Sequence, residues 1–314
     1  MSQKFEIEPV SGEIREYTCR ALNGVNAIEV TRTGRDDFIH YYFGTYQDLA
    51  FTFPSDKESS KIFVEKHLVV SKGEAFKSFK RGAQNVITDV SLDTFKEMIQ
   101  HIYGGPHVNI HEGNFLEILR ASRKFSVHSL TYEVLLFLVD FLNGENLPKY
   151  FVEIDKFSIK MINDFMRHTC IVSPLVIIEN LTISNPAYKR LLSIILEFPC
   201  LSCTEFELYN GIMSMLKKEF QRLKKPLIDE EFRNELGQMI YLIRFPAMSL
   251  EDLMECAKKP TLLTSQELID IQMWVKERIF SQSLQFFSVA PRLTRLHPNL
   301  QKSYIKPHQE PQEC

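Results

Sequence analysis

The spacing of apolar residues in the first part of the chain is typical of strands. Apolar and polar side chains alternate in two runs, Leu49–Phe53 and Lys61–Val64, and the polar segment 54–60 separates them. Alternation puts every second side chain on one face of a strand, so the two runs predict a β-hairpin. A similar strip at Ala27–Thr31 predicts one further strand within the otherwise weakly patterned N-terminal segment.

The spacing becomes helical after residue 90. Apolar residues recur every three or four positions in three segments, at 92–102, at 115–125 and from about 129 onward. Ser91 stands where an N-cap is expected, and Asp93 falls in the first turn, where a negative charge is favourable. The Gly-Gly-Pro run at 104–106 must end the first of these helices.

Helical patterns continue from residue 146 to about residue 280. One apolar stripe consists of Tyr188, Leu191, Leu192, Ile195 and Phe198. Two capping boxes, Thr204–Glu207 and Thr264–Glu267, mark helix starts, because the Thr and Glu side chains of such a box each bind a free backbone amide. We therefore expect an all-helical second domain.

A chain of 314 residues suits two domains. The patterns divide it into an N-terminal extension (1–45), an α+β domain (46–145), a helical domain (146–280) and a C-terminal tail (281–314). The tail is assigned from its prolines and from the scarcity of apolar residues after Leu300.

Charge and apolar content narrow the classes of function. A net charge of −3 gives no positive field that would attract a phosphate backbone, so we expect no nucleic-acid partner. The first ten residues contain no apolar run, which argues against a secretory signal. The most apolar stretch, Val134–Leu142, is about half as long as a membrane span and contains Asp140, so it predicts a core helix and no membrane association. Six scattered cysteines fit reduced thiols in the cytoplasm, and a nuclear location is equally consistent with them.

The chain has no recognisable catalytic motif. None of its 12 glycines has the spacing of a phosphate loop, and no nucleophile elbow is present. We expect no enzyme activity, no catalytic residue and no cofactor. The remaining enzyme hypothesis is a catalytic domain within residues 1–45, which is a short segment for an independent domain.

Two pairs of residues have spacings known from metal sites. His107 and His111 are four residues apart, but Val108–Ile110 alternates as a short strand, and a strand would hold the histidines about 13 Å apart. Cys200 and Cys203 form a single CxxC motif, and no second pair completes four zinc ligands. We interpret these residues as surface histidines and ordinary thiols, and we expect no metal.

Two charged features require an interpretation. A basic cluster near a helix end consists of Lys217, Lys218, Arg222, Lys224 and Lys225. No aromatic platform for stacking bases interleaves with these cations, which favours a solvated helix face over nucleic-acid contact. Arg244 lies between Ile243 and Phe245, where a buried guanidinium would need a carboxylate, and Glu251 and Asp252 are the nearest candidates. Docking of a partner is the alternative role for Arg244.

Several strings resemble known domains. Lys61–His67 resembles the BTB segment in which a strand leads into a helix start that contains histidine, and Val90–Gly105 resembles a BTB helix that ends in Ile-Tyr and a turn. Asn114–Phe125 is similar to the helix that follows. In the second part, Gly237–Ser249 is similar to the BACK-domain signature of the BTB-BACK-PHR family. Further similarity lies at Leu262–Glu267, Trp274 and residues 286–295.

This resemblance spans roughly residues 46–280 and implies an α+β BTB/POZ domain followed by an all-α BACK-like helical domain. It implies a homodimer with Asp48 and His67 near its interface. It also implies a cullin-3 groove that includes Phe76, Phe79, Ala83 and Tyr103. Members of the family are substrate adaptors, so the chain would be a protein-interaction adaptor that brings an unidentified protein substrate to a cullin-3 ubiquitin ligase.

The sequence departs from the family at four points. No PHR domain follows the BACK-like part, Met215 occupies the position of a family tryptophan, and Leu68 replaces the lysine after the BTB histidine. The segment 79–87 lacks the acidic residue that contacts the cullin. This last departure supports the alternative function, a BTB-BACK scaffold or transcription-linked interaction protein without cullin binding.

Overall fold

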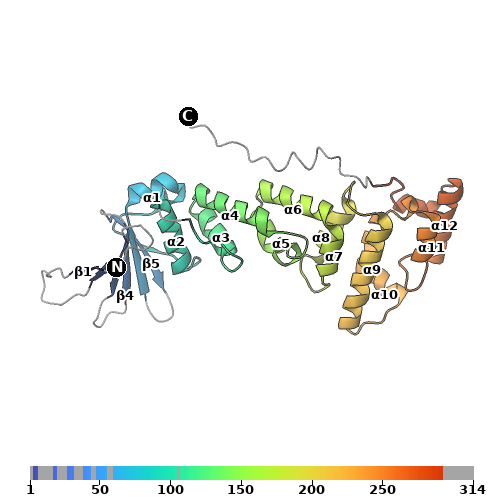
Figure 1. Cartoon of the computed structure of the whole chain (residues 1–314), viewed down its shortest axis with the longest axis horizontal. Coiled ribbons are helices and arrows are strands. Elements are labelled where there is room, and N and C mark those ends of the chain that lie inside the picture. Colours follow the sequence, from blue (N-terminus) through green and yellow to red (C-terminus); the bar gives the residue numbers. More distant parts are fainter. Residues whose placement is uncertain are drawn as a thin grey trace, which may run out of the picture. The chain divides into compact units, whose positions relative to one another are not determined.

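A computed structural model describes residues 3–5, 17–19, 27–31, 38–43, 47–54, 59–104 and 107–292. They belong to two compact units that divide between Asp140 and Phe141, a few residues before the expected domain boundary at 145/146. The first unit combines strands with helices, whereas the elements of the second are all helical (Figure 1).

The first unit contains a seven-stranded mixed sheet with the order β1-β2-β3-β4-β6-β5-β7. Its strands are β1 (Gln3–Phe5), β2 (Tyr17–Cys19), β3 (Ala27–Thr31), β4 (Phe38–Phe43), β5 (Leu49–Pro54), β6 (Ser59–Val64) and β7 (Gln84–Val86). The predicted strand is β3, and the predicted hairpin is the antiparallel pair β5–β6, in which Phe51 lies opposite Ile62.

The expected N-terminal extension is part of this sheet. Strand β4 pairs in parallel with β6, and β3, β2 and β1 follow outward in antiparallel order. Four strands from residues 1–45 therefore continue the sheet of the domain that follows them, and no domain boundary separates the two segments.

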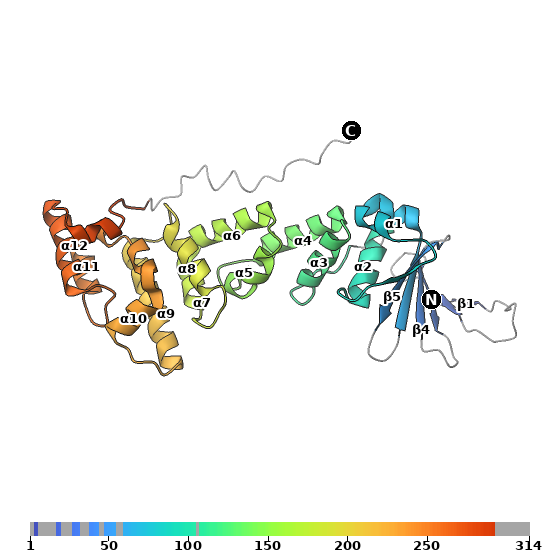
Figure 2. The same ribbon diagram turned by 180° about the vertical axis from the view of Figure 1, so that it is seen from behind.

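The helices of the first unit are α1 (Lys66–Lys72), the 3-10 helix η1 (Glu74–Ser78), α2 (Leu92–Ile102), α3 (Phe115–Lys124) and α4 (His128–Phe141). Helices α1 and α2 lie next to the strands in both views (Figures 1 and 2). Ser91 caps α2 as predicted, because its side chain accepts a hydrogen bond from the amide of Thr94.

A cluster of phenylalanine rings lies at the centre of the first unit. Six rings from the sheet, η1, α2 and the segments that follow η1 and α3 form one cluster: Phe51, Phe53, Phe76, Phe79, Phe95 and Phe125. The rings of Phe51 and Phe95 are 4.9 Å apart, and those of Phe76 and Phe125 stack at 5.0 Å. Burying each ring contributes about 1.5–3 kcal/mol, so the cluster accounts for much of the stability of this unit.

The second unit consists of α5 (Leu147–Asp155), α6 (Lys160–Val172), α7 (Pro174–Asn180), α8 (Tyr188–Glu197), α9 (Glu205–Arg222), α10 (Asp229–Leu236), η2 (Gly237–Leu242), η3 (Phe245–Ala247), α11 (Leu250–Cys256), α12 (Ser265–Glu277) and η4 (Gln282–Phe286). Both predicted capping boxes are present, at the starts of α9 and α12. Helices α7 and α9 pack closely at Gly211, which has no side chain. A Cβ added at this glycine would lie only 3.2 Å from Leu175 Cδ2.

The described part of the expected tail belongs to this second unit. Leu284 is fully buried, and Phe287 and Arg292 are nearly so. Residues 282–292 thus contribute to the core instead of starting a separate segment. Among the residues with a described structure, no helix has both the length and the apolar character needed to cross a membrane.

Candidate protein-interaction site

Asp48 already has two partners within the first unit. Its Oδ1 accepts a hydrogen bond from the amide of Lys66 at 2.7 Å, and its Oδ2 pairs with Arg81 Nε at 2.6 Å. The carboxylate therefore caps the start of α1 and ties β5 to the turn before β7. A group from a second copy would have to displace Arg81 to bind it, and the interface role of Asp48 stays a prediction.

His67 lies on the surface of α1. Its side chain is 68% exposed, and its Nε2 lies 3.7 Å from Glu65 Oε2. Glu65 is buried, and its amide donates to the Tyr103 hydroxyl at 2.8 Å. Among the expected interface residues, His67 is therefore the one whose side chain is accessible to a partner.

The four expected groove residues divide into different environments. Phe76 is fully buried, so it cannot contact a partner directly and instead supports the surface from beneath. Phe79 and Ala83 are half-buried in the segment between η1 and β7, and the rings of Phe76 and Phe79 lie 6.2 Å apart. Tyr103 packs on Phe43 at 5.9 Å, and burial raises the pKa of its hydroxyl to about 12. Phe79, Ala83 and Tyr103 are thus each partly accessible, and Phe79 and Ala83 lie on the same segment.

The segment that carries Phe79 and Ala83 is held firmly. Lys66 Nζ donates to the carbonyl of Phe79 at 2.5 Å. The side-chain nitrogen of Asn85, Nδ2, donates to the carbonyls of Ala50 at 2.9 Å and of Lys80 and Ala83 at 3.3 Å. The segment therefore presents one conformation, which lowers the entropy cost of binding there.

The expected strand at residues 107–111 is wrong, because this segment has no regular secondary structure. The Asn114 side chain accepts from the His111 amide and donates to the carbonyl of Asn109, and these bonds form a polar turn before α3. The two histidines have separate partners, since His107 Nδ1 lies 3.2 Å from Glu133 Oε1 and His111 Nδ1 accepts from the Gly113 amide.

A histidine that the sequence analysis did not single out shares Glu133. His101 Nε2 lies 2.8 Å from the Ser129 hydroxyl, and its Nδ1 is 3.9 Å from Glu133 Oε1. Burial lowers the pKa of His101. Within the described ranges, no three His, Cys, Asp or Glu side chains are grouped so that they could hold a metal ion.

The thiols and the basic cluster occupy structural environments. Cys203 is buried, which raises the pKa of its thiol to about 11, and Cys200 is half-buried. Arg222 forms two hydrogen bonds with Glu219, at 2.9 and 2.8 Å, and Lys225 Nζ lies 3.3 Å from Glu235. All five basic residues are exposed, as the solvated-face interpretation expects.

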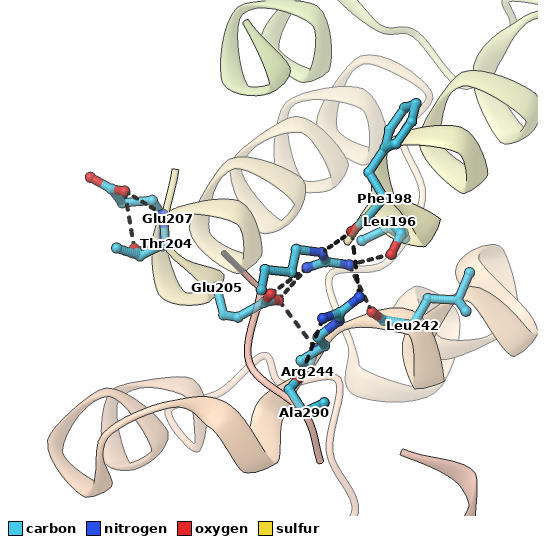
Figure 3. Close-up of polar contacts among 9 residues, drawn as sticks. Leu196, Phe198, Thr204, Glu205, Glu207, Leu242, Arg244 and Ala290 are labelled. Carbon is cyan, nitrogen blue, oxygen red and sulfur yellow. Dashed lines mark hydrogen bonds and ion pairs between the residues drawn. The ribbon is translucent and has the colours of Figure 1, made fainter. Parts of the chain in front are cut away.

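The expected partner of Arg244 is wrong. Its guanidinium donates to the carbonyls of Ala290 at 3.1 Å and Phe198 at 3.4 Å (Figure 3). Asp252 is unavailable to it, because this carboxylate binds the Ser249 hydroxyl at the start of α11. Arg244 remains half-exposed, so it does not need the full ion pair that a buried guanidinium would require.

The buried arginine of this unit is Arg292, which the sequence analysis missed. Its side chain is 2% exposed and binds both oxygens of Glu205 at 2.5 Å. The carbonyls of Leu196, Phe198 and Leu242 converge on the same guanidinium (Figure 3). Each nitrogen of the Arg292 guanidinium therefore has a hydrogen-bond acceptor. The ion pair with Glu205 fixes Arg292 to the start of α9. No periodicity or motif around Arg292 signals this role.

Comparison with known proteins supports an interaction module. The chain is similar to BTB/POZ domain-containing proteins. It is 28% identical to human BTB/POZ domain-containing protein 6 over 86 residues, which is 27% of this chain and 16% of that protein. The Xenopus laevis protein 6 is 30% identical over 83 residues, covering 26% of this chain and 16% of that protein. Human BTB/POZ domain-containing protein 3 is 25% identical over 188 residues, covering 60% of this chain and 36% of that protein.

These similarities are distant, and the chain spans well under half the length of each relative. No family model matches the chain. The names of the relatives nevertheless support a BTB relationship, and the sheet and helices of the first unit are compatible with a BTB-like α+β fold. The BTB/POZ class is one of protein-interaction domains.

Proposed function

We propose that this protein is an interaction adaptor that acts by binding alone and recruits a protein substrate to a cullin-3 ubiquitin ligase. The similarity to BTB/POZ domain-containing proteins carries the proposal. The fixed, half-buried segment with Phe79 and Ala83 supports it, since a partner could bind there without first ordering the loop.

In this proposal the first unit forms a homodimer and binds the cullin, and the helical second unit is a BACK-like domain. His67 lies at the dimer interface, and Phe79 and Ala83 contact the cullin while Phe76 supports them from the core. No catalytic residue or cofactor takes part. The adaptor would act in the cytoplasm or nucleus.

The direct test is calorimetric titration of the full chain with the cullin-3 N-terminal domain, together with the mass from light scattering. We expect a dimer and a Kd below about 1 μM, which corresponds to roughly 8 kcal/mol. Ala83→Arg should weaken binding at least tenfold, because a long charged side chain would fill the surface beside Phe79. Ala257→Arg introduces the same change at a half-buried alanine of the second unit and should leave binding intact.

One observation favours a second function. Residues 79–87 contain two basic residues, Lys80 and Arg81, and no acidic one. A scaffold or transcription-linked interaction protein that does not bind cullin-3 fits this charge better. A folded dimer that releases no heat with the cullin domain would select this alternative, whereas a folded monomer would contradict the dimeric part of both.

A further inference from the structure

Among the described residues, no strand pairs with the outer edge of β7. In the order of the described strands it comes last, and its partner there is β5, in parallel. Successive residues of a strand point their N–H and C=O groups to opposite edges. The Ile87 amide donates to the carbonyl of Thr52 at 2.9 Å, so the backbone groups of Asn85 and Ile87 face β5. Those of Gln84 and Val86 therefore face away from the sheet.

The side chains at this edge do not protect it. Gln84 is exposed, and the apolar side chain of Val86 is 53% exposed. Proteins usually blunt an open edge with charged residues, proline, a bulge or a covering element, or by keeping the strand short. The three residues of β7 contain no charge and no proline, so of the protections carried by the strand itself, its shortness is the one that limits pairing here.

The edge is also rigid before any partner binds. Asn85 fastens β7 to the Ala50 carbonyl and to the turn that precedes it, through Lys80 and Ala83. Arg81 in the same turn is held by Asp48. Binding of a peptide would therefore cost the conformational entropy of the peptide but little conformational entropy of β7.

We propose that the open edge of β7 binds an extended segment of a partner protein, which adds to the sheet as a further strand. The outward N–H and C=O groups of Gln84 and Val86 supply four backbone hydrogen bonds, and the Val86 side chain contacts its cross-strand neighbour. Lys80 is exposed in the turn before β7 and favours an acidic residue at that end of the peptide. The inference rests on the proposed protein-binding function, but it requires neither cullin-3 nor a dimer.

The test starts from a random nine-residue peptide library displayed on phage and selected on the full chain. The selected peptides are then titrated by fluorescence anisotropy against wild type and Val86→Pro. Proline removes an N–H that β5 does not use, so the sheet can keep its own bonds while an added strand loses one. We expect at least a tenfold loss of affinity.

A proline in the second unit provides the matched control. Ser265 is the exposed first residue of α12, where proline is well tolerated, so Ser265→Pro should bind the peptides as wild type does. Unchanged affinity in Val86→Pro, or a library without any enriched peptide, would overturn the proposal.

Hydrogen exchange separates the proposal from simple misfolding of the variant. In the free wild-type chain, the Gln84 and Val86 amides should exchange fast and the Ile87 amide slowly. The selected peptide should slow exchange of the first two at least tenfold and leave Ile87 as it was. Peptide binding without this protection would place the site elsewhere. Failure of the cullin-3 titration alone would leave this result standing, so the two proposals fail independently.

Discussion

The two units bury their cores with different chemistry. The first packs phenylalanine rings that come from distant parts of its sequence, such as Phe51, Phe95 and Phe125. The second packs aliphatic side chains around separate aromatic pairs such as Phe220 and Phe232, and it contains a buried ion pair between Glu205 and Arg292. An aromatic core loses stability gradually with lost volume, whereas a closed polar network fails when one member is removed. The units should therefore respond differently to single substitutions.

The single tryptophan, Trp274, allows this difference to be measured, because it lies in the second unit. Its fluorescence follows that unit, while far-ultraviolet circular dichroism follows both. Each of the following variants can thus be assigned to one unit in a urea titration.

The largest effect is expected from Phe76→Ala. Removing a fully buried ring that stacks on Phe125 leaves a cavity and should cost about 3–5 kcal/mol of unfolding free energy. Circular dichroism should show an early transition that the Trp274 emission does not follow. If both signals moved together, the two units would unfold in one transition, which would contradict the expectation that they respond differently.

Arg292→Ala should destabilise the second unit by about 3 kcal/mol, because it leaves Glu205 buried without its counter-charge. The Trp274 transition should shift to lower urea. Replacing both charges, in Arg292→Met with Glu205→Leu, should recover much of the loss. A double variant no more stable than Arg292→Ala would show that the carbonyl contacts of Arg292, and not the ion pair, hold the unit closed.

Thr264→Ala removes the N-cap of α12 and should cost about 1 kcal/mol. Thr264 caps the helix that carries Trp274, so the fluorescence transition should report the change. Ser265→Ala changes the neighbouring exposed hydroxyl and serves as the control. Alanine is the better helix former, so Ser265→Ala should cost nothing, and a loss as large in this control would contradict the assignment to the Thr264 cap.

The smallest effect is a pH dependence of the first unit. Burial lowers the pKa of His101 below its ordinary value near 6.5, so in acid the unfolded state binds a proton more readily than the folded state. Stability should therefore fall as the pH drops below about 6.5. His101→Gln should flatten this part of the curve of unfolding free energy against pH. An unchanged slope in the variant would assign the effect to another group.

Local patterns in the sequence predicted those elements whose signal is itself local. The β5–β6 hairpin, the helices from 92 onward and both capping boxes follow from alternation, from three-and-four spacing and from caps. Strands β1 and β2 have three residues each, which is too few to show a period, so the sequence did not indicate that residues 1–45 extend the sheet.

The polar contacts were harder to predict, because their partners are distant in sequence or compete with local bonds. Asp252 seemed a partner for Arg244 by proximity, but its carboxylate accepts a hydrogen bond from Ser249, the N-cap of the same helix. Arg292 meets Glu205 across 87 residues, in a segment that composition alone assigned to a tail. The groove residues were taken from resemblance, which does not distinguish a core ring such as Phe76 from the half-buried Phe79 beside it.

The ion pair between Glu205 and Arg292 has a consequence for the timing of folding on the ribosome. Synthesis proceeds at about 5–20 residues per second, so Glu205 is added to the chain roughly 4–17 s before Arg292. During that interval the start of α9 carries an unpaired carboxylate, and the site that will receive Arg292 is open to water. The second unit can therefore complete its packing only after residue 292 has left the exit tunnel, although the phenylalanine core of the first unit is synthesised long before.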